Sequence, residues 1–156
     1  MTSAAPRSRQ QRKADTLARL QQKLIDVWVS SASGAEDAVQ PYLVPLSLAW
    51  IDDRIVIALD GDSRTARNIT AGGRVRLGLG PTRDVVLIDA DLERVTPAAE
   101  ADDGLVERYV SQAGWDPRKA GGASALMLLR PRRIQAWREV NELAGRTLMR
   151  EGIWLD

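Results

Sequence analysis

The alternation of hydrophobic and polar positions predicts that most of the chain forms short strands. The β-branched and aromatic run IDVWVSSAS predicts a strand that ends at Gly34. Two apolar runs, at about residues 42–50 and 54–60, flank the polar turn IDDR and predict a hairpin. A second hairpin is predicted for RVRLGLG and DVVLIDADLERV. A long strand, ASALMLLRPRRIQAW, follows with a bend expected at Pro131.

Three segments have helical spacing instead. Leucines at intervals of three and four predict a helix over residues 14–24, and a further helix is expected over residues 97–112. Between the two hairpins, SRTARNITA predicts a short helix that Gly72 and Gly73 end. The balance is mainly β with a few helices, an α+β fold. Because successive hairpins give antiparallel pairing, we expect an antiparallel sheet of about six strands that closes into a small barrel.

Composition and charge are ordinary for a globular protein, apart from the first residues. The chain has 156 residues, 44% hydrophobic and 28% charged, with a net charge of +1. The basic residues of the first thirteen positions have no acidic neighbour there, which predicts a disordered tail over residues 1–13, with a functional arm as the alternative. Residues 14–156 are expected to form one domain. The near-neutral charge gives no support for a nucleic-acid partner.

The absence of cysteine and histidine narrows the chemistry. It excludes disulfides, thiolate or imidazole metal sites, and nucleophilic catalysis of the Ser-His-Asp or Cys-His type. If the protein is an enzyme, a cofactor is expected to supply much of its chemistry. No apolar run is long enough to span a membrane, and we expect a cytoplasmic protein without a membrane partner.

The start of the short middle helix carries the strongest candidate site. Ser63 has the position of a helix cap, and Arg64 and Arg67 follow at helical spacing. A hydroxyl, free helix amides and an arginine together can hold a phosphate, although spacing alone favours a plain capped helix with solvated arginines. Pro45 in the preceding strand indicates an edge, a bulge or a nearby ligand, because proline cannot donate to a sheet.

The order of these motifs resembles the flavin-binding split-barrel family of pyridoxamine 5'-phosphate oxidase, and within it the actinobacterial flavin- and deazaflavin-dependent oxidoreductases. The resemblance is carried by VWVSSAS, PYLVPLSLAW, IVIALDGDSRTARNI, RVRLGLG, DVVLIDADLERV, GWDPR and RPRRIQAWREVNELAGRTLMREGIWL, from about residue 16 to 155. It implies a six-stranded split β-barrel of the FMN-binding type. It also implies a homodimer with cofactor sites at the subunit interface.

The resemblance further implies a set of cofactor-binding residues. The strand Leu43, Val44, Pro45 and Leu46 would face the flavin ring, and Ile57 and Ala58 would border it. Ser63 and Arg64 would hold the phosphate. The oxidase has a lysine at the position of Thr65, and Arg67 or Asn68 would compensate for it here. Trp137 and Arg146 would reach the cofactor of the partner. The substrate-binding histidine of the oxidase is absent, which argues against vitamin B6 oxidation.

The sequence therefore predicts an oxidoreductase that uses FMN or the deazaflavin F420 and transfers a hydride to or from a small organic substrate. No catalytic side chain is identified, and no metal site is expected. The nineteen arginines, against three lysines, fit the acidic tail that F420 carries and FMN lacks. A non-catalytic flavin-binding or carrier module is the alternative.

Overall fold

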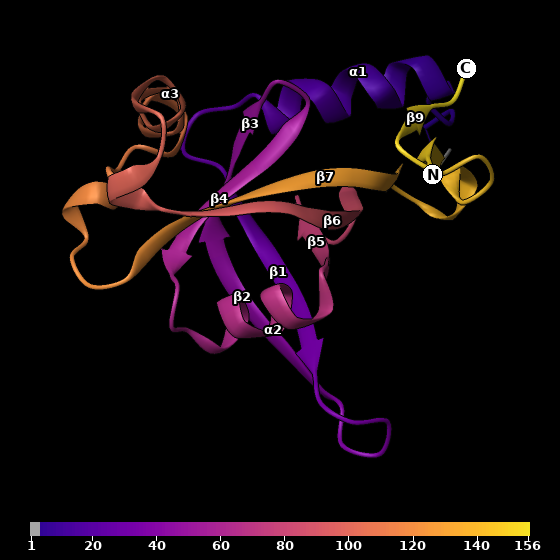
Figure 1. Ribbon diagram of the computed structural model, residues 1–156. Coiled ribbons are helices and arrows are strands. Elements are labelled where there is room, and N and C mark those ends of the chain that lie inside the picture. Colours follow the sequence, from indigo (N-terminus) through magenta and orange to yellow (C-terminus); the bar gives the residue numbers. More distant parts are fainter. Residues whose placement is uncertain (1–3) are drawn as a thin grey trace.

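The computed structural model describes residues 4–156, which form nine strands and three α-helices (Figure 1). The strands are β1 (Asp26–Ser33), β2 (Gln40–Ser47), β3 (Ala49–Ile51), β4 (Arg54–Asp60), β5 (Arg74–Leu79), β6 (Val85–Pro97), β7 (Ser124–Trp137), β8 (Thr147–Arg150) and β9 (Ile153–Trp154). The helices are α1 (Arg9–Leu20), α2 (Arg64–Gly72) and α3 (Asp103–Ala113), with short 3-10 turns at Ala98–Glu100, Pro117–Lys119 and Val140–Glu142. The predicted α+β class is confirmed.

All pairings between the strands are antiparallel, and the sheet does not close. Its order is β2-β1-β5-β6-β7-β4-β3, with β8 added to β7 and β9 added to β8. Strand β2 approaches β4 in space, but no hydrogen-bonded ladder joins them. The expectation of a closed barrel is therefore wrong, and the strands form a split barrel. Figure 1 shows α1 above the middle strands and α2 below them.

The pairing of β2 differs from the sequence prediction. The run at residues 42–50 breaks at Leu48, whose amide donates to the carbonyl of Ile25. Its first part, β2, pairs over its whole length with β1, and only the short β3 forms the hairpin with β4. Pro45 lies opposite Trp28 on an edge strand, where its missing N–H breaks no ladder.

The first helix begins five residues earlier than predicted. Ser8 is its cap, with a hydroxyl that accepts from the amide of Gln11 at 3.1 Å. Its buried face consists of Arg12, Thr16 and Leu20. The expected disordered tail is thus wrong for residues 9–13, which are helical because Arg12 finds buried carbonyl acceptors on the C-terminal part of the chain. Residues 1–3 of that tail lie outside the described residues.

Two predictions about the longer strands are confirmed. In β5 the odd and even positions separate, with Arg74 and Arg76 outside and Val75 and Leu77 inside. Strand β7 has a β-bulge beside Pro131. Asp89 and Ala90 of β6 pair with Arg133 and Pro131, and Arg132 between them is skipped. The bulge lets one long strand serve both halves of the sheet.

The core has two parts that share β4. The larger part fills the space between the barrel strands, α1 and α2, and it includes Ile57. The smaller part joins α3 to β3, β4 and β7, and it includes Ala58 and Tyr109. Strand β4 is therefore buried on both faces. Across residues 4–156, the helices are too short or too polar to cross a membrane.

Candidate functional site

The N-terminus of α2 has the local geometry that the sequence predicted. Ser63 is extended, and its hydroxyl accepts a hydrogen bond from the amide of Ala66 at 3.1 Å. The amides of Arg64 and Thr65 precede the first bond inside the helix, so they face outward from the helix end. The turn before the helix is fixed by Asp60, whose carboxylate accepts from the amide of Asp62 at 2.9 Å. Gly73 ends the helix in the left-handed conformation, with φ of 69°.

This helix end opens into a pocket of about 220 Å³ between β2, β4 and α2. Its lining consists of Tyr42, Val44, Leu46, Leu59, Asp60, Ser63, Arg64 and Thr65. One wall is mainly apolar and comes from β2 and Leu59 of β4. The other wall carries the hydroxyl of Ser63, a helix N-terminus, a guanidinium and the carboxylate of Asp60, which is held by the amide of Asp62. This combination suits a ligand with a flat apolar body and an anionic group.

Arg64 of α2 and Tyr42 of β2 meet at the pocket from two different elements. The guanidinium carbon of Arg64 lies 4.8 Å from the centre of the Tyr42 ring. Such a stack holds the arginine without neutralising its charge. No carboxylate in residues 4–156 forms an ion pair with Arg64. The guanidinium thus keeps its hydrogen-bond donors for an anion at the helix end.

The strand residues predicted to face a ring divide between two faces. Val44 and Leu46 line the pocket, together with Tyr42. Leu43 and Pro45 point to the opposite, exposed face of β2, because successive side chains of a strand alternate. Of the four residues expected along a ring, only Val44 and Leu46 line this pocket with their side chains.

The two residues predicted at the end of the next strand are buried instead. The side chains of Ile57 and Ala58 are 0% and 2% exposed and belong to the two parts of the core. Leu59 and Asp60, which follow them, line the pocket. The sequence could have indicated this burial, because the apolar run of β4 is uninterrupted, which is typical of a strand covered on both faces.

Arg67 and Asn68 of α2, which were also expected to contact the cofactor, do not line the pocket. Asn68 is 3% exposed, and its amide donates to the hydroxyl of Ser31 at 3.2 Å while its carbonyl accepts from Ser33. Arg67 is exposed and donates to the carbonyl of Asp62 at 3.2 Å. Neither side chain lies at the pocket beside Arg64, where the oxidase has a lysine and this chain has Thr65. Asn68 joins α2 to β1, which is a structural role.

Trp137 and Arg146 come together, but away from the α2 pocket. The guanidinium carbon of Arg146 lies 5.4 Å from the centre of the Trp137 ring. The pair stands where β7 ends and β8 begins, and neither residue lines the α2 pocket. Within one chain these two residues cannot complete that pocket. Their predicted contact with a cofactor requires a second copy.

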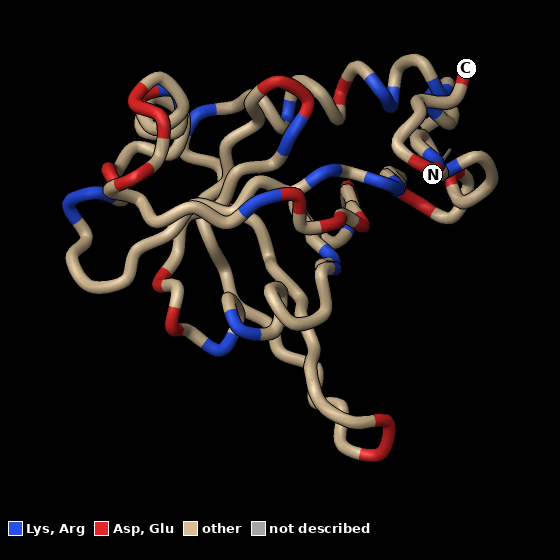
Figure 2. The backbone as a smooth tube through the Cα atoms, in the orientation of Figure 1, with Lys and Arg blue, Asp and Glu red and all other residues tan. Residues whose placement is uncertain are grey.

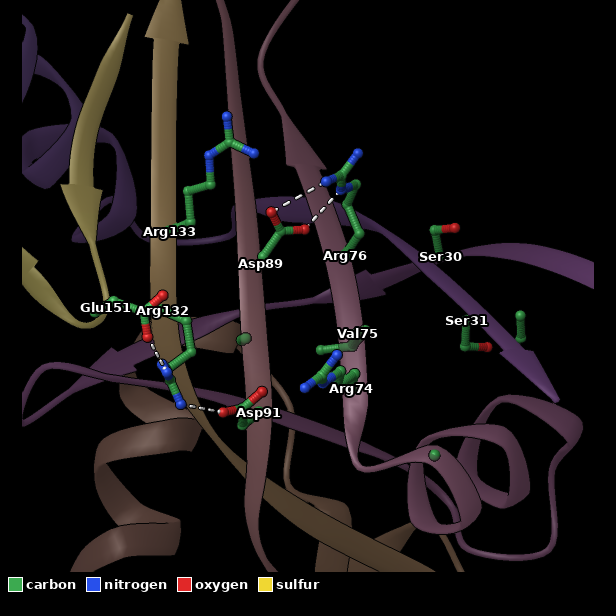
Figure 3. A pocket seen from close by; sticks show the side chains of 13 residues that line it. Ser30, Ser31, Arg74, Val75, Arg76, Asp89, Asp91, Arg132, Arg133 and Glu151 are labelled. Atoms are coloured by element: carbon green, nitrogen blue, oxygen red, sulfur yellow. Dashed lines mark hydrogen bonds and ion pairs between the residues drawn. The ribbon is translucent and has the colours of Figure 1, made fainter.

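A larger hollow, of about 570 Å³, lies on the outer face of β1, β5, β6 and β7. Most of its charges neutralise one another (Figure 3). Arg76 binds Asp89 with a shortest distance of 2.6 Å, and Arg132 bridges Asp91 and Glu151. Arg74 and Arg133 are drawn there without a partner. This polar, mostly neutralised surface lacks the apolar wall of the α2 pocket.

The strongest pKa shifts lie outside both hollows and have structural causes. Hydrogen bonds from Arg7 lower the pKa of Glu142 to about 2, against the cost of its burial. Burial raises the pKa of Tyr109 to about 12, so this phenol on the buried face of α3 stays neutral. These groups stabilise the fold and do not identify an acid or a base for catalysis.

Comparison with known proteins agrees with this architecture. Residues 15–138 match the family model for pyridoxamine 5'-phosphate oxidase. No curated protein matches the sequence. An F420 reductase structure superimposes with a TM-score of 0.58 at 12% identity, covering 74% of this chain and 92% of that one. General Stress Protein 26 from Bacillus anthracis gives 0.54 at 15% identity, covering 80% and 94%. A heme binding protein from Mycobacterium smegmatis gives 0.59 at 14% identity, covering 94% and 59%.

Proposed function

The chain belongs to the pyridoxamine 5'-phosphate oxidase family, and from this premise we propose that it is an oxidoreductase that uses FMN or the deazaflavin F420. It transfers a hydride between the cofactor and a small organic substrate. The observation that carries the proposal is the α2 pocket. There, an apolar strand faces a capped helix end that bears an arginine without an acidic partner.

The residues present fit the anionic end of such a cofactor. Ser63, the free amides of α2 and Arg64 would hold the phosphate, because each presents a donor at the positive end of the helix dipole. Val44 and Leu46 would lie against the ring system, on the apolar wall. Thr65, which replaces the family's lysine, is buried at 3% exposure and adds a hydroxyl rather than a charge. Arg64 is then the main cation of the cradle.

When bound, a flavin or deazaflavin supplies the hydride chemistry itself. The protein binds the cofactor, orients it and excludes water from one face with the apolar side chains of β2. With no histidine or cysteine in the chain, proton transfer falls to solvent or to the Tyr42 hydroxyl beside the pocket. The F420 reductase with the same fold supports the deazaflavin as one of the two candidate cofactors.

A homodimer would explain the small size of the pocket. Its volume of about 220 Å³ is below the range of roughly 300–1,000 Å³ in which small ligands usually bind. We propose that a second copy covers the open side, and that the partner's Trp137 and the partner's Arg146 reach the cofactor there. The stacking of these two residues on each other supports this arrangement, since it prepares a rigid aromatic and cationic surface.

Titration of the purified protein with FMN and with F420, followed by absorbance and fluorescence, tests the proposal. Saturable binding of at least one cofactor, lost in Arg64→Ala, is the expected result. If neither cofactor binds, the proposal is wrong. A bound cofactor whose spectrum no reductant or acceptor changes would favour the alternative, a flavin-binding carrier module.

A further inference from the structure

A third hollow, separate from the α2 pocket and from the hollow beside Arg76, brings four arginines together. It measures about 570 Å³ and lies between the start of α1, the end of β7 and the segment from Leu143 to Arg150. Its lining consists of Arg9, Arg133, Gln135, Leu143, Ala144, Gly145, Arg146, Thr147, Arg150 and Leu155. No aspartate or glutamate side chain lines it, and it shares no residue with the α2 pocket.

The arginines of this pocket differ from those around it. Nearby, Arg7, Arg83 and Arg138 all form ion pairs, with Glu142, Glu139 and Asp84 respectively. Within residues 4–156, Arg133 and Arg150 have no acidic partner, and Arg146 is held only by its stack on Trp137. Figure 2 shows basic and acidic segments interspersed in the part of the molecule near the C-terminus.

Arg9 adds a buried donor to this set. One nitrogen of its guanidinium donates to a main-chain oxygen of Asp156. Its Nε is buried and has no acceptor in the described part of the chain. Guanidinium groups that share a hollow repel one another, and an anion in the pocket would relieve this repulsion.

The wall of the pocket is fixed in place before any ligand arrives. Arg12 reaches from α1 and donates to the carbonyls of Glu142 and Ala144, at 3.0 and 3.4 Å. The carbonyl of Arg146 accepts from the amide of Ala136 at 3.0 Å. The backbone that carries Gly145 and Arg146 is thus tied to both α1 and β7. Such a fixed set of donors lowers the entropic cost of binding.

We propose that this arginine pocket binds a small polyanion, a molecule with two or more carboxylate or phosphate groups. Guanidinium groups bind both kinds of group in a bidentate manner, and four of them exceed what one singly charged group can neutralise. The volume of about 570 Å³ suits a compact ligand. The inference rests on the arginines alone and does not require the flavin proposal to hold.

Calorimetric titration with tripolyphosphate at low ionic strength tests the site. We expect saturable binding that weakens by about tenfold or more in the double variant Arg133→Gln with Arg150→Gln. The matched control is Arg83→Gln with Arg108→Gln, which removes the same charge from exposed arginines that are already paired. Binding should be nearly unchanged there. Absence of binding, or an equal loss in both double variants, would overturn the proposal.

Two further measurements separate this site from the α2 pocket and identify the source of the anion. Tripolyphosphate binding should persist in Arg64→Ala; its loss there would place the anion at α2 and refute the arginine pocket. Competition then uses FMN and F420. Displacement by F420 alone identifies the acidic tail of the cofactor as the ligand, and the absence of displacement identifies a separate metabolite. Both of these results support the arginine pocket as a polyanion site.

Discussion

Arg64 at the first position of α2 stacks on Tyr42 of β2, with 4.8 Å between the guanidinium carbon and the ring centre. The two residues come from elements that do not pair with each other, and their contact spans the mouth of the α2 pocket. The stack sets the direction of the guanidinium and leaves its donors free. A sequence motif, an arginine after a capping serine, thereby becomes a directed anion site.

The first prediction concerns this arginine. Arg64→Ala should weaken binding of FMN or F420 by roughly 1.5–3 kcal/mol, the free energy of hydrogen bonds to a charged group. Fluorescence titration measures the loss. Arg67→Ala, on the same helix and outside the pocket, is the control and should bind as the unchanged protein does. Equal affinity of the Arg64 variant and the control would contradict the assignment.

Substitutions of Ser63 distinguish a helix cap from an anion site. Ser63→Ala should lower the free energy of unfolding by about 1 kcal/mol, because the amide of Ala66 loses its acceptor. Ser63→Asp should keep the cap and the stability, since aspartate caps equally well, but it should weaken cofactor binding by charge repulsion. Denaturant unfolding and cofactor titration on both variants give the two readouts. Full cofactor affinity in Ser63→Asp would leave Ser63 as a cap only.

The part of the fold that was predictable from the sequence is the part determined locally. Helix α2 was predicted because its cap and its terminal glycines lie within ten residues of each other. The partner of β2 was not, because β1 and β4 both lie close to it in sequence and the apolar pattern alone does not choose between them. The start of α1 was missed for another reason. The acceptors that hold Arg12 lie more than a hundred residues away.

The site shows the same division. Ser63, Arg64 and Thr65 line one pocket together because a helix end fixes their relative positions. For β2 the alternation of side chains could have shown that Leu43 and Pro45 face away from Val44 and Leu46. The arginine pocket was beyond any sequence argument. Its members come from α1, β7 and β8, and only the folded chain reveals that they lack acidic partners.

Asn68 should act on stability and leave cofactor affinity unchanged. Asn68→Ala leaves the buried hydroxyl of Ser31 without its partner and removes the acceptor of the exposed Ser33 hydroxyl, at a cost of roughly 1–3 kcal/mol. Thr70→Ala, on the exposed side of the same helix, is the control. Chemical unfolding of both variants measures the difference. Weaker cofactor binding by a stably folded Asn68 variant would restore the sequence-based role of this residue.

The ion pair between Arg7 and Glu142 should make stability depend on pH. The pKa of Glu142 falls from 4.5 to about 2 on folding, so the charged carboxylate stabilises the fold above pH 4.5. This contribution is lost as the pH falls from about 4.5 towards 2. Glu142→Gln should be destabilised by about 3 kcal/mol near neutral pH, because Arg7 is then left without its main partner. Denaturant unfolding at several pH values should show that this difference shrinks in acid. A difference independent of pH would contradict the assignment.

Mixed dimers test whether each cofactor site combines two chains. In a heterodimer of one Arg64→Ala copy and one Arg146→Ala copy, each carrying its own purification tag, one site would combine the intact Arg64 with the intact Arg146 of the partner subunit. The other site would lack both. If Arg146 serves the partner's pocket, the heterodimer should bind cofactor with unchanged affinity at half of its sites, whereas both homodimers bind weakly. A dimer of two differently tagged Arg64→Ala copies is the control and should have no such site. This is the expected outcome, because Arg146 stacks on Trp137 and does not line the α2 pocket of its own chain. A heterodimer without any unchanged site would refute the shared arrangement.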